Sequence, residues 1–514
     1  MNIQHPRGWA SSAPDKLAFV LADSNESLTY AELVQRSDRA AQAFASLGIA
    51  PGDTIALLVE NHIRYPELVW AAKNSGLRYV AISTHLNSAD ASYIIRDCGA
   101  KLLVTSWKMR AIAHGAIVDL ETQPHLLMLD GCEAPFSSYE ALVGTAPPEA
   151  LPGRRRGASM LYSSGTTGRP KGVATQITDA PPEAPPHRHA MLVSRFEIDD
   201  NSVFLDAGPL YHAGPLRFMM TVQRCGGVVI AFTRFDAAEA LAAIEAYGAT
   251  HAFFVPTMLA RMLKLPAQTR QSSNLSTMRH AIHSAAPCPT DVKRAMIDWW
   301  GPVIDELYSG TEGVGHTIIS SEEWLLHPGS VGRAAGACSI KIVDANGNIL
   351  PPGPAGRIMM RNGLQFAYHG DPDKTASVRD EDGYTSLGDV GYLDADGFLY
   401  LTDRESHMII SGGVNIYPQE AEAVLGSHPE IEDVAVIGVP HVDMGEEVKA
   451  VVQPRSMPQD PVALENDIID FCRARLSAIK CPKSVDFVAK LPRSEMGKLA
   501  KHVIKASYWD NHKA

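Results

Sequence analysis

The chain has little of what a secreted or membrane-inserted protein needs. Its 514 residues include only seven cysteines, which are scattered and form no C-x-x-C pair. This pattern argues against a disulfide framework and against a tetrahedral zinc site. No apolar run reaches the roughly 18 residues of a membrane-spanning helix, and the first residues lack the regions of a signal peptide. We therefore expect a cytoplasmic protein without an integral membrane segment.

Positive charge is also scarce. Lys and Arg number 46 against 58 Asp and Glu, which gives a formal net charge of −12. This balance argues against nucleic acid as the main partner. A local basic run, Arg154–Arg156, stands on an expected loop, and we interpret it as a solvated turn. The sequence does not indicate an oligomeric state.

The length predicts more than one folding unit, because single cores stop growing at about 250–300 residues. Helix-like and strand-like segments alternate early in the chain and again later, a rhythm typical of a mostly parallel sheet covered by helices. Residues 341–400 read as short strands in a small β-rich subdomain, and residues 407–514 as a small α+β domain. The expected fold class is α/β. The expected helices are residues 28–45 and 237–247, and the expected strands are residues 54–59, 79–82 and 227–232.

The most informative segment is residues 163–172, which combine hydroxyls, glycines and two cations. Glycine permits close backbone approach, and successive backbone N–H groups in such a loop can form an anion-binding nest. The segment is not the common P-loop, because Lys171 is followed by Gly172 instead of Ser or Thr. It resembles the phosphate-binding loop of the adenylate-forming enzymes, which include acyl-CoA synthetases, firefly-type luciferases and peptide-synthetase adenylation domains.

Further segments match this family in order over essentially the whole chain, and we identify the acyl-CoA synthetase branch as the best match. The resemblance implies that Tyr308 packs beside adenine, that Thr311 contacts phosphate and that Glu312 holds Mg²⁺, an ion that prefers oxygen ligands. Ser309 stands where relatives often have Gly. The implied ribose contacts are Asp389 and Arg404, and a carboxylate can accept two hydroxyls side by side.

The C-terminal part supplies the catalytic lysine of this resemblance. Lys498 follows a glycine, as in the family, and would stabilise charge during attack on the α-phosphate. The resemblance implies a domain rotation between two half-reactions, with residues 1–404 as the N-terminal domain, 405–406 as the hinge and 407–514 as the mobile domain. Ser406 takes the hinge position, where relatives commonly have Asp or Lys. Ser411, Gly412 and Gly413 would line the tunnel for the pantetheine arm of CoA after rotation.

The acyl pocket is expected around the segment after Tyr211. The resemblance implies that His212 gates the passage between acyl and thiol sites, although a histidine that only caps a buried turn stays an alternative. The small and apolar residues that follow favour an apolar acid: fatty, branched or aromatic. The predicted acyl-pocket residues are His212, Ala213, Gly214, Met219 and Ser284. We interpret the proline-rich segment 178–189 as a surface insertion.

The predicted sites are as follows. The catalytic residues are Lys498, Thr311, Glu312 and His212. The ATP- and AMP-binding residues are Ser163, Ser164, Gly165, Thr166, Thr167, Gly168, Lys171, Ala285, Ala286, Pro287, Glu306, Tyr308, Ser309, Gly310, Thr311, Asp389 and Arg404, and the metal ligands are Glu312 and Thr166.

The implied activity is that of an ATP- and Mg²⁺-dependent acid–CoA ligase. A carboxylic acid would react with ATP to give acyl-AMP and pyrophosphate, and the thiol of CoA would then form the thioester and release AMP. One alternative is an adenylating enzyme that passes the acyl group to a carrier-protein thiol or to another acceptor. Another is a nucleotide-binding regulator without catalysis, which the joint presence of Glu312, Asp389, Arg404 and Lys498 disfavours.

Overall fold

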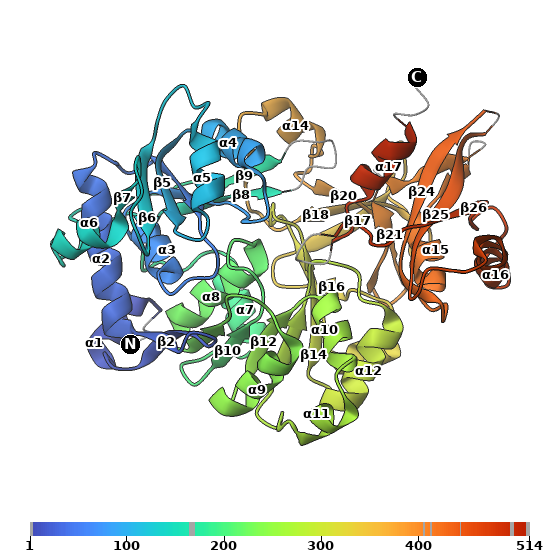
Figure 1. Cartoon of the computed structure of the whole chain (residues 1–514), viewed down its shortest axis with the longest axis horizontal. Helices are drawn as coiled ribbons and strands as arrows, with labels where there is room; N and C mark the ends of the chain where they lie inside the picture. The colour runs from blue at the N-terminus through green and yellow to red at the C-terminus, as the bar shows by residue number, and fades with distance from the viewer. Residues whose placement is uncertain are drawn as a thin grey trace.

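The computed structural model describes residues 4–163, 170–404, 407–411, 414–442, 444–493 and 498–509. Two large mixed sheets form the body of the molecule, and the C-terminal part packs at one end of it (Figure 1). The α/β fold class expected from the sequence is confirmed. None of the described helices is long and apolar enough to cross a membrane.

The first large sheet has nine strands and a parallel centre. Antiparallel strands close both of its edges. Its strands, in spatial order, are β16 (Arg333–Ala334), β15 (His316–Ile319), β14 (Ile304–Ser309), β13 (His280–His283), β12 (His251–Phe254), β10 (Val203–Asp206), β11 (Val228–Ala231), β1 (Leu17–Leu21) and β2 (Glu26–Thr29).

The second large sheet has eight strands and is parallel from β8 to β7. Its order is β19 (Phe366–Tyr368), β9 (Lys171–Thr175), β8 (Ala158–Ser163), β4 (Arg78–Ala81), β3 (Thr54–Leu58), β5 (Ala100–Ser106), β6 (His125–Leu129) and β7 (Ser137–Ser138). The expected strands at residues 54–59 and 79–82 are therefore confirmed within one residue at each end.

Helices cover both large sheets. The apolar side chains between these layers form one extended core to which both sheets contribute, with Trp70 and Trp324 among its largest buried members. The helices are α1 (Pro6–Ser12), α2 (Tyr30–Ser46), α3 (Tyr65–Asn74), α4 (Ser88–Asp97), α5 (Arg110–Ile117), α6 (Tyr139–Thr145), α7 (His189–Arg195), α8 (Ala213–Cys225), α9 (Ala237–Tyr247), α10 (Pro256–Leu263), α11 (Ala267–Ser272), α12 (Thr290–Trp300), α13 (Ser321–Leu326) and α14 (Pro372–Ser377).

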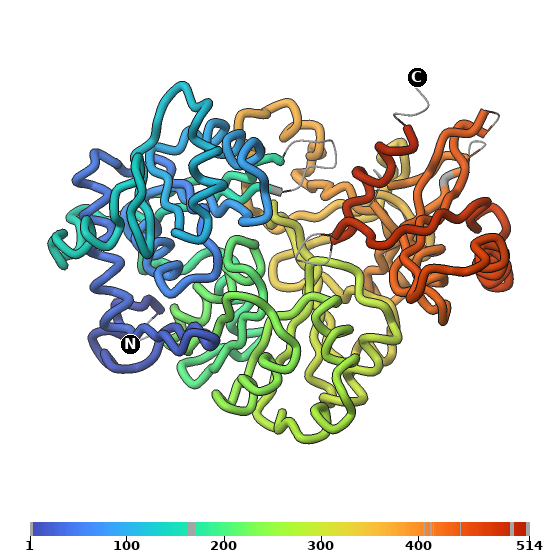
Figure 2. The backbone as a smooth tube through the Cα atoms, in the orientation of Figure 1, coloured from blue at the N-terminus to red at the C-terminus, as the bar shows by residue number. Residues whose placement is uncertain are grey.

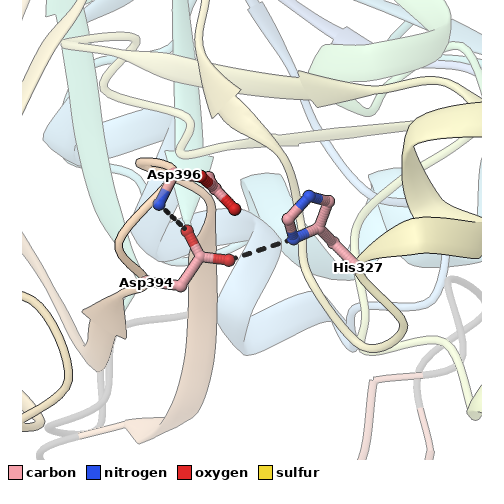
Figure 3. A group of neighbouring side chains, drawn as sticks. All are labelled: His327, Asp394 and Asp396. Carbon is pink, nitrogen blue, oxygen red and sulfur yellow. Dashed lines mark hydrogen bonds and ion pairs between the residues drawn. The ribbon is translucent and has the colours of Figure 1, made fainter.

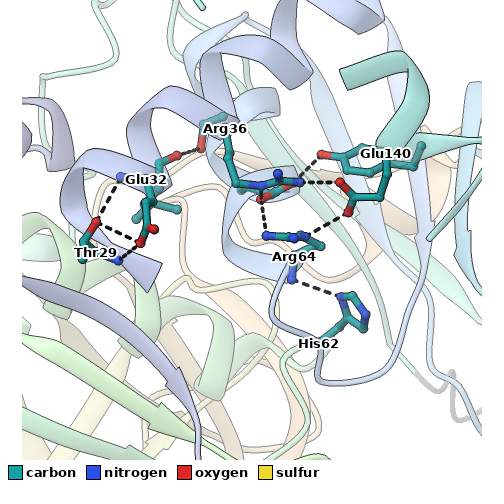
Figure 4. Close-up of polar contacts among 10 residues, drawn as sticks. Thr29, Glu32, Arg36, His62, Arg64 and Glu140 are labelled. Carbon is teal, nitrogen blue, oxygen red and sulfur yellow. Dashed lines mark hydrogen bonds and ion pairs between the residues drawn. The ribbon is translucent and has the colours of Figure 1, made fainter. Parts of the chain in front are cut away.

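A buried carboxylate ties together three helices at the N-terminal end. Glu67 of α3 is fully buried and accepts hydrogen bonds from Arg36 of α2, at 2.5 Å, and from Tyr139 of α6, at 2.7 Å. Arg36 and Arg64 also reach Glu140, at 2.9 and 3.0 Å (Figure 4). Helix α2 begins with a capping box, in which the side chains of Thr29 and Glu32 satisfy the first backbone donors (Figure 4). This network fixes how α2, α3 and α6 pack.

Two smaller sheets follow. The antiparallel four-stranded sheet is the β-rich unit expected at residues 341–400, and it contains β17 (Ser339–Val343), β18 (Gly356–Arg361), β20 (Thr385–Leu393) and β21 (Leu399–Arg404). The C-terminal sheet contains β23 (Val414–Ile416), β22 (Ile409–Ser411), β25 (Gly445–Pro454), β24 (Ile431–His441) and β26 (Ser484–Phe487). Its helices are α15 (Pro418–Leu425), α16 (Pro461–Arg473) and α17 (Lys501–Trp509). The tube in Figure 2 shows this last part beside the four-stranded sheet.

Candidate functional site

A cavity of about 2910 Å³ lies where the C-terminal part meets the body of the molecule. Strands β12, β13 and β14 end at it, so the turns after their carboxyl ends form part of its wall. Such an edge of a parallel sheet is where α/β proteins bind ligands, because the loops there are free to vary. Both the body and the C-terminal part supply side chains to this cavity.

Asp389 and its two partners form one wall. Asp389 lies on β20 directly opposite Arg404 on β21, and the Arg404 Nε is 3.0 Å from its Oδ1. The hydroxyl of Tyr308, at the end of β14, donates to the other oxygen at 2.6 Å. The carboxylate is thus oriented and only 10 % exposed, and each oxygen keeps a lone pair that a ligand hydroxyl can use.

The turn after β14 carries Thr311 and Glu312 into the cavity. Glu312 accepts a hydrogen bond from the Tyr368 hydroxyl, at 2.9 Å, through one oxygen. Gly310 must lack a side chain, because a Cβ there would lie 2.7 Å from Glu312 Oε2 and 2.8 Å from Leu387. Ser309 is held by a hydrogen bond from its hydroxyl to Gly315 O, at 2.8 Å. The turn therefore presents one oriented carboxylate with oxygen donor atoms that suit Mg²⁺.

The small residues after β13 form the next part of the wall. Ala285 has a φ of 77°, a left-handed conformation that is uncommon outside glycine, and Ala286 and Pro287 follow it along the cavity. Ser284 donates its hydroxyl to Leu307 O at 2.5 Å, which ties this turn to β14. Because Ala285 and Ala286 have small side chains, a flat ligand can approach the backbone of this turn closely.

Glu306 lines the cavity, and a buried lysine forms an ion pair with its carboxylate. Lys293 of α12, buried beneath it, reaches Glu306 Oε2 at 2.7 Å, and the His283 ring lies 3.5 Å from the same oxygen. Burial raises the pKa of Glu306, and Lys293 opposes this rise. Lys293 was not expected from the sequence, since a single lysine on a helix gives no signal of its burial.

Lys498 enters the cavity from the C-terminal part. Its neighbours are Arg404, Asp389 and Glu312, which are the groups expected around the nucleotide. Burial and then the positive charge of Arg404 lower the pKa of Lys498, while the two carboxylates raise it. A cation held among these groups can stabilise negative charge that develops during a reaction.

Lys171 lies at the start of β9, on the other side of the cavity. Its ammonium is 3.3 Å from Asp371 Oδ2 and 5.8 Å from the centre of the Tyr368 ring. Ser164, Gly165, Thr166, Thr167 and Gly168 lie outside the described residues, as does the side chain of Ser163. The predicted phosphate loop and the Thr166 metal ligand therefore stay predictions.

His212 stands at the N-terminus of α8 with its ring against Tyr211, at 4.6 Å between ring centres. The ring makes no capping hydrogen bond to the helix, which argues against a purely capping role. Burial, and then the charge of Lys498, lower the pKa of His212 to about 3. The imidazole is therefore neutral near pH 7, and it lines the cavity together with Ala213 and Gly214.

One predicted acyl-pocket residue is wrong. Met219 is 0 % exposed and packs in the core, while the next residue, Met220, lines the cavity. The reason is helical geometry, because each step along α8 turns the side chain by about 100°. Phe253 from β12 supplies further apolar wall and packs so closely that a Cβ at Gly214 would lie 2.6 Å from its ring.

The wall at this end also holds cations that the sequence did not single out: Lys73, Arg188 and Arg217. The interpretation of Arg154–Arg156 as a solvated turn is wrong for Arg154 and Arg156, whereas Arg155 is exposed. Arg156 donates to the carbonyls of Ala184 and Pro185, and Arg154 pairs with Glu183 at 2.5 Å. These arginines hold the proline-rich segment 178–189 against the body, where Thr178 and Pro186 line the cavity. The segment is thus part of the site wall and not merely a surface insertion.

The predicted tunnel residues belong to the arrangement expected after rotation of the C-terminal part, and the predicted hinge is where that rotation would occur. Ser406, Gly412 and Gly413 lie outside the described residues. Ser411 lies on β22, is 7 % exposed and is not among the residues that line the cavity. These assignments stay predictions.

A second polar group, His327 with Asp394 and Asp396, has the spacing of a metal site (Figure 3). The hydrogen bonds of this group are instead those that stabilise a turn. Asp394 accepts from the backbone of Asp396 and Phe398, at 3.0 and 2.8 Å, and from the His327 ring at 3.1 Å. The carboxylate is an ordinary turn-forming aspartate, so the group is structural.

Comparisons with known proteins agree with this geometry. Residues 7–367 match the family model described as AMP-binding enzyme, and residues 420–498 match that of the AMP-binding enzyme C-terminal domain. The chain is 31% identical over 485 residues to a feruloyl-CoA synthase of Amycolatopsis sp, covering 94% of each chain. It is 32% identical over 514 residues to a 2-succinylbenzoate–CoA ligase of Bacillus licheniformis, covering 98% of this chain and 100% of that protein.

Among solved structures, the ATP-bound MatB from Rhodopseudomonas palustris superposes with a TM-score of 0.84. Its sequence identity to this chain is 28%, and the match covers 99% of this chain and 100% of MatB. The likeness therefore extends over both the body and the C-terminal part.

Proposed function

The chain belongs to the AMP-binding enzyme family, and from this membership we propose that it is an ATP-dependent acid–CoA ligase. The proposal rests on one observation above all. Lys498 from the C-terminal part meets Glu312, Asp389 and Arg404 of the body in one cavity. A protein that only sensed a nucleotide would not need a desolvated lysine at this place. The curated relatives that act on feruloyl, succinylbenzoyl and fatty acyl groups with CoA support the reaction class.

In the proposed first step, a carboxylic acid attacks the α-phosphorus of ATP and pyrophosphate leaves. Asp389 and Arg404 hold the ribose, and Tyr308 and the Ala285–Pro287 turn hold the adenine. Lys498 offsets the negative charge that builds up between the carboxylate and the α-phosphate. Most of the rate enhancement would come from positioning and charge stabilisation, as no protein nucleophile is required.

Mg²⁺ fits the residues present, since Glu312 offers a fixed carboxylate beside the expected phosphates. Glu312, with Thr166 of the phosphate loop, would hold the ion, which supplies charge neutralisation on the phosphate oxygens when bound. Tyr368 holds Glu312 in place through its 2.9 Å hydrogen bond.

In the proposed second step, residues 407–514 rotate about residues 405–406 and remove Lys498 from the cavity. Ser411, Gly412 and Gly413 would then line the path of the pantetheine arm, and the thiol of CoA would attack the acyl-AMP and release AMP. His212, neutral near pH 7, lies at the junction of the two paths. We place this activity in the cytoplasm, which suits the seven free cysteines.

The experiment is to measure pyrophosphate and AMP formation from ATP over a panel of fatty, aromatic, branched and dicarboxylic acids, with and without CoA. Acid-dependent pyrophosphate release that CoA accelerates, together with thioester formation, supports the ligase. Pyrophosphate release that CoA leaves unchanged would point to a carrier-protein thiol or another acceptor. No acid-dependent release with any acid would overturn the proposal.

A further inference from the structure

The acyl end of the cavity is more positively charged than an apolar acid requires. Arg217 lies on α8 one turn beyond His212, and Arg188 precedes α7. Both guanidinium groups lie against the turn between β14 and β15. Arg217 donates to Thr311 O at 2.9 Å, and Arg188 occupies the space that a side chain on Gly313 would fill.

Neither arginine forms an ion pair with a carboxylate within the described part of the chain. The hydrogen bond to Thr311 O engages one nitrogen of the Arg217 guanidinium, which has five N–H donors, and Arg217 lines the cavity. Burial lowers the pKa of Arg217, and Tyr79 and Glu312 only partly oppose it. Burial and then Arg217 lower the pKa of Arg188 well below its ordinary value. Two desolvated cations with no anionic partner are costly unless a ligand supplies the charge.

Lys73 extends this positive region. Its ammonium donates to Gly157 O at 3.1 Å and lies 5.7 Å from the centre of the Tyr79 ring. Burial, followed by Arg224, Arg156 and Arg217, lowers the pKa of Lys73 to about 7. The charged groups that act on Lys73 are all cations, so Lys73 adds to the positive charge around Arg217.

The neighbouring arginines differ because they already have structural partners. Arg224 donates to the carbonyls of Gln4, Pro182 and Glu183, at 2.7 to 3.2 Å. Arg156 donates to the carbonyls of Ala184 and Pro185. These two hold the proline-rich segment, whereas the guanidinium groups of Arg188 and Arg217 make no hydrogen bond to that segment in the described part of the chain.

We propose that the acid activated by this enzyme carries a second anionic group, most simply a second carboxylate, which Arg188 and Arg217 bind. This inference rests on the proposed ligase function and names its substrate class. Arg217 lies five positions after His212, which is about 7.5 Å along a helix. The substrate is therefore a dicarboxylic acid with a short apolar or aromatic body, over which Met220 and Phe253 lie.

The ATP phosphates are the other anions that could reach this cavity. The residues expected at these phosphates are Lys171, Glu312 and Lys498, and Glu312 belongs to the same turn that Arg217 and Arg188 contact. The test must therefore separate the two sources of negative charge, and the KM for ATP does so.

The experiment compares aliphatic and aromatic dicarboxylic acids with their monomethyl esters. The ester keeps the shape of the acid and removes only the distal charge. We expect kcat/KM for pyrophosphate release to be about 10- to 100-fold higher for the preferred diacid than for its monoester, as a charged hydrogen bond would provide. Equal or better turnover of the monoesters, with the ligase otherwise active, would overturn the inference and leave the ligase proposal intact.

Arg217→Met and Arg188→Met remove the charge and keep most of the apolar stem. Each is expected to raise the KM for the diacid about 10-fold or more, to leave the KM for ATP unchanged and to abolish the preference over the monoester. Arg155→Met is the matched control, because Arg155 is 58% exposed and pairs with the exposed Asp179. A rise in the KM for ATP instead of the acid would assign both arginines to the nucleotide and overturn the inference. Inactivity of the wild type toward every mono- and diacid would refute the ligase proposal itself.

Discussion

Lys498 shows how a residue recognised by motif acquires its chemistry from its surroundings. The sequence placed it after a glycine near the C-terminus, and the structure adds Arg404, Asp389 and Glu312 around it. Burial and the charge of Arg404 lower the pKa of Lys498, while the two carboxylates raise it. The side chain is therefore a charge that the reaction can use with little reorganisation.

We predict that Lys498→Ala slows acid-dependent pyrophosphate release by about 100-fold or more, because a preorganised charge at a reacting centre is worth that much. ATP binding should persist, since Asp389, Arg404 and Tyr308 remain. Stopped-flow adenylation and equilibrium binding of ATP measure the two effects. Lys490→Ala, an exposed lysine of the same C-terminal part, is the control. Unchanged adenylation in Lys498→Ala would remove the lysine from the mechanism.

The pH dependence of adenylation follows from the same lysine. Its pKa is lowered, so it loses its proton at a lower pH than the ordinary value of about 10.5. Because the protonated form is the active one, the rate should fall as pH rises through this lowered pKa. Lys498→Arg should be slower but should lack this basic limb, since guanidinium does not deprotonate in this range. A basic limb that persists in Lys498→Arg would assign it to another group.

At the scale of single elements, the packing of α2, α3 and α6 depends on one buried carboxylate. Glu67 holds Arg36 and Tyr139 at 2.5 and 2.7 Å in an environment closed to water. Arg36 and Arg64 also form ion pairs with Glu140, so that a network of ion pairs links the three helices. Hydrophobic periodicity predicts each helix separately and carries no information about this connection.

We predict that Glu67→Ala destabilises the N-terminal part by about 3 to 5 kcal/mol, the usual cost of removing one member of a buried ion pair. The reason is that Arg36 would stay partly buried without its partner. The midpoint of the first unfolding transition, followed by circular dichroism in urea, reports the change. Tyr139→Phe removes one hydrogen bond to the same carboxylate and should cost far less. A midpoint that does not move in Glu67→Ala would contradict this account.

Helix α8 shows what the sequence of a single helix does not determine, namely which of its faces lines the cavity. Of the residues predicted for the acyl pocket, His212, Ala213 and Gly214 line the cavity, whereas Met219 lies in the core and Met220 lines the cavity instead. The sequence also gave no signal for Arg217, which lies on the same face as the residues that line the cavity. The direction of a helix face is set by the sheet beneath it, so the phase of a helix is decided by packing across layers.

At the scale of the whole molecule, a contact between the body and the C-terminal part supports the present arrangement. Lys264, just after α10, reaches Glu432 on β24 at 2.5 Å. Lys264 is 60% exposed, so the pair is screened by solvent and contributes modestly. Such a contact suits an interface that must open between the two proposed steps.

We predict that Lys264→Met slows adenylation by less than about fivefold and leaves thioester formation from preformed acyl-AMP unchanged, since an exposed pair is worth about 0.2–1 kcal/mol. Single-turnover measurements of each step separate these effects. The effect on adenylation should shrink at high salt. Lys108→Met, at an exposed lysine of the body, is the control. Equal slowing of both steps would show that the contact does not distinguish the two arrangements.

The sequence by itself determined the α/β fold class, the β-rich unit, the family resemblance and several of the residues that line the cavity. Local signals carried these results: hydrophobic period, glycine-rich turns and short motifs in a fixed order. Only the tertiary structure decided that Lys293 neutralises Glu306, that Met220 lines the pocket and that Arg188 and Arg217 face the cavity without a carboxylate partner among the described residues. The physical reason is that burial and pairing depend on groups far apart in the chain, and no local pattern records which charges the fold leaves for a ligand.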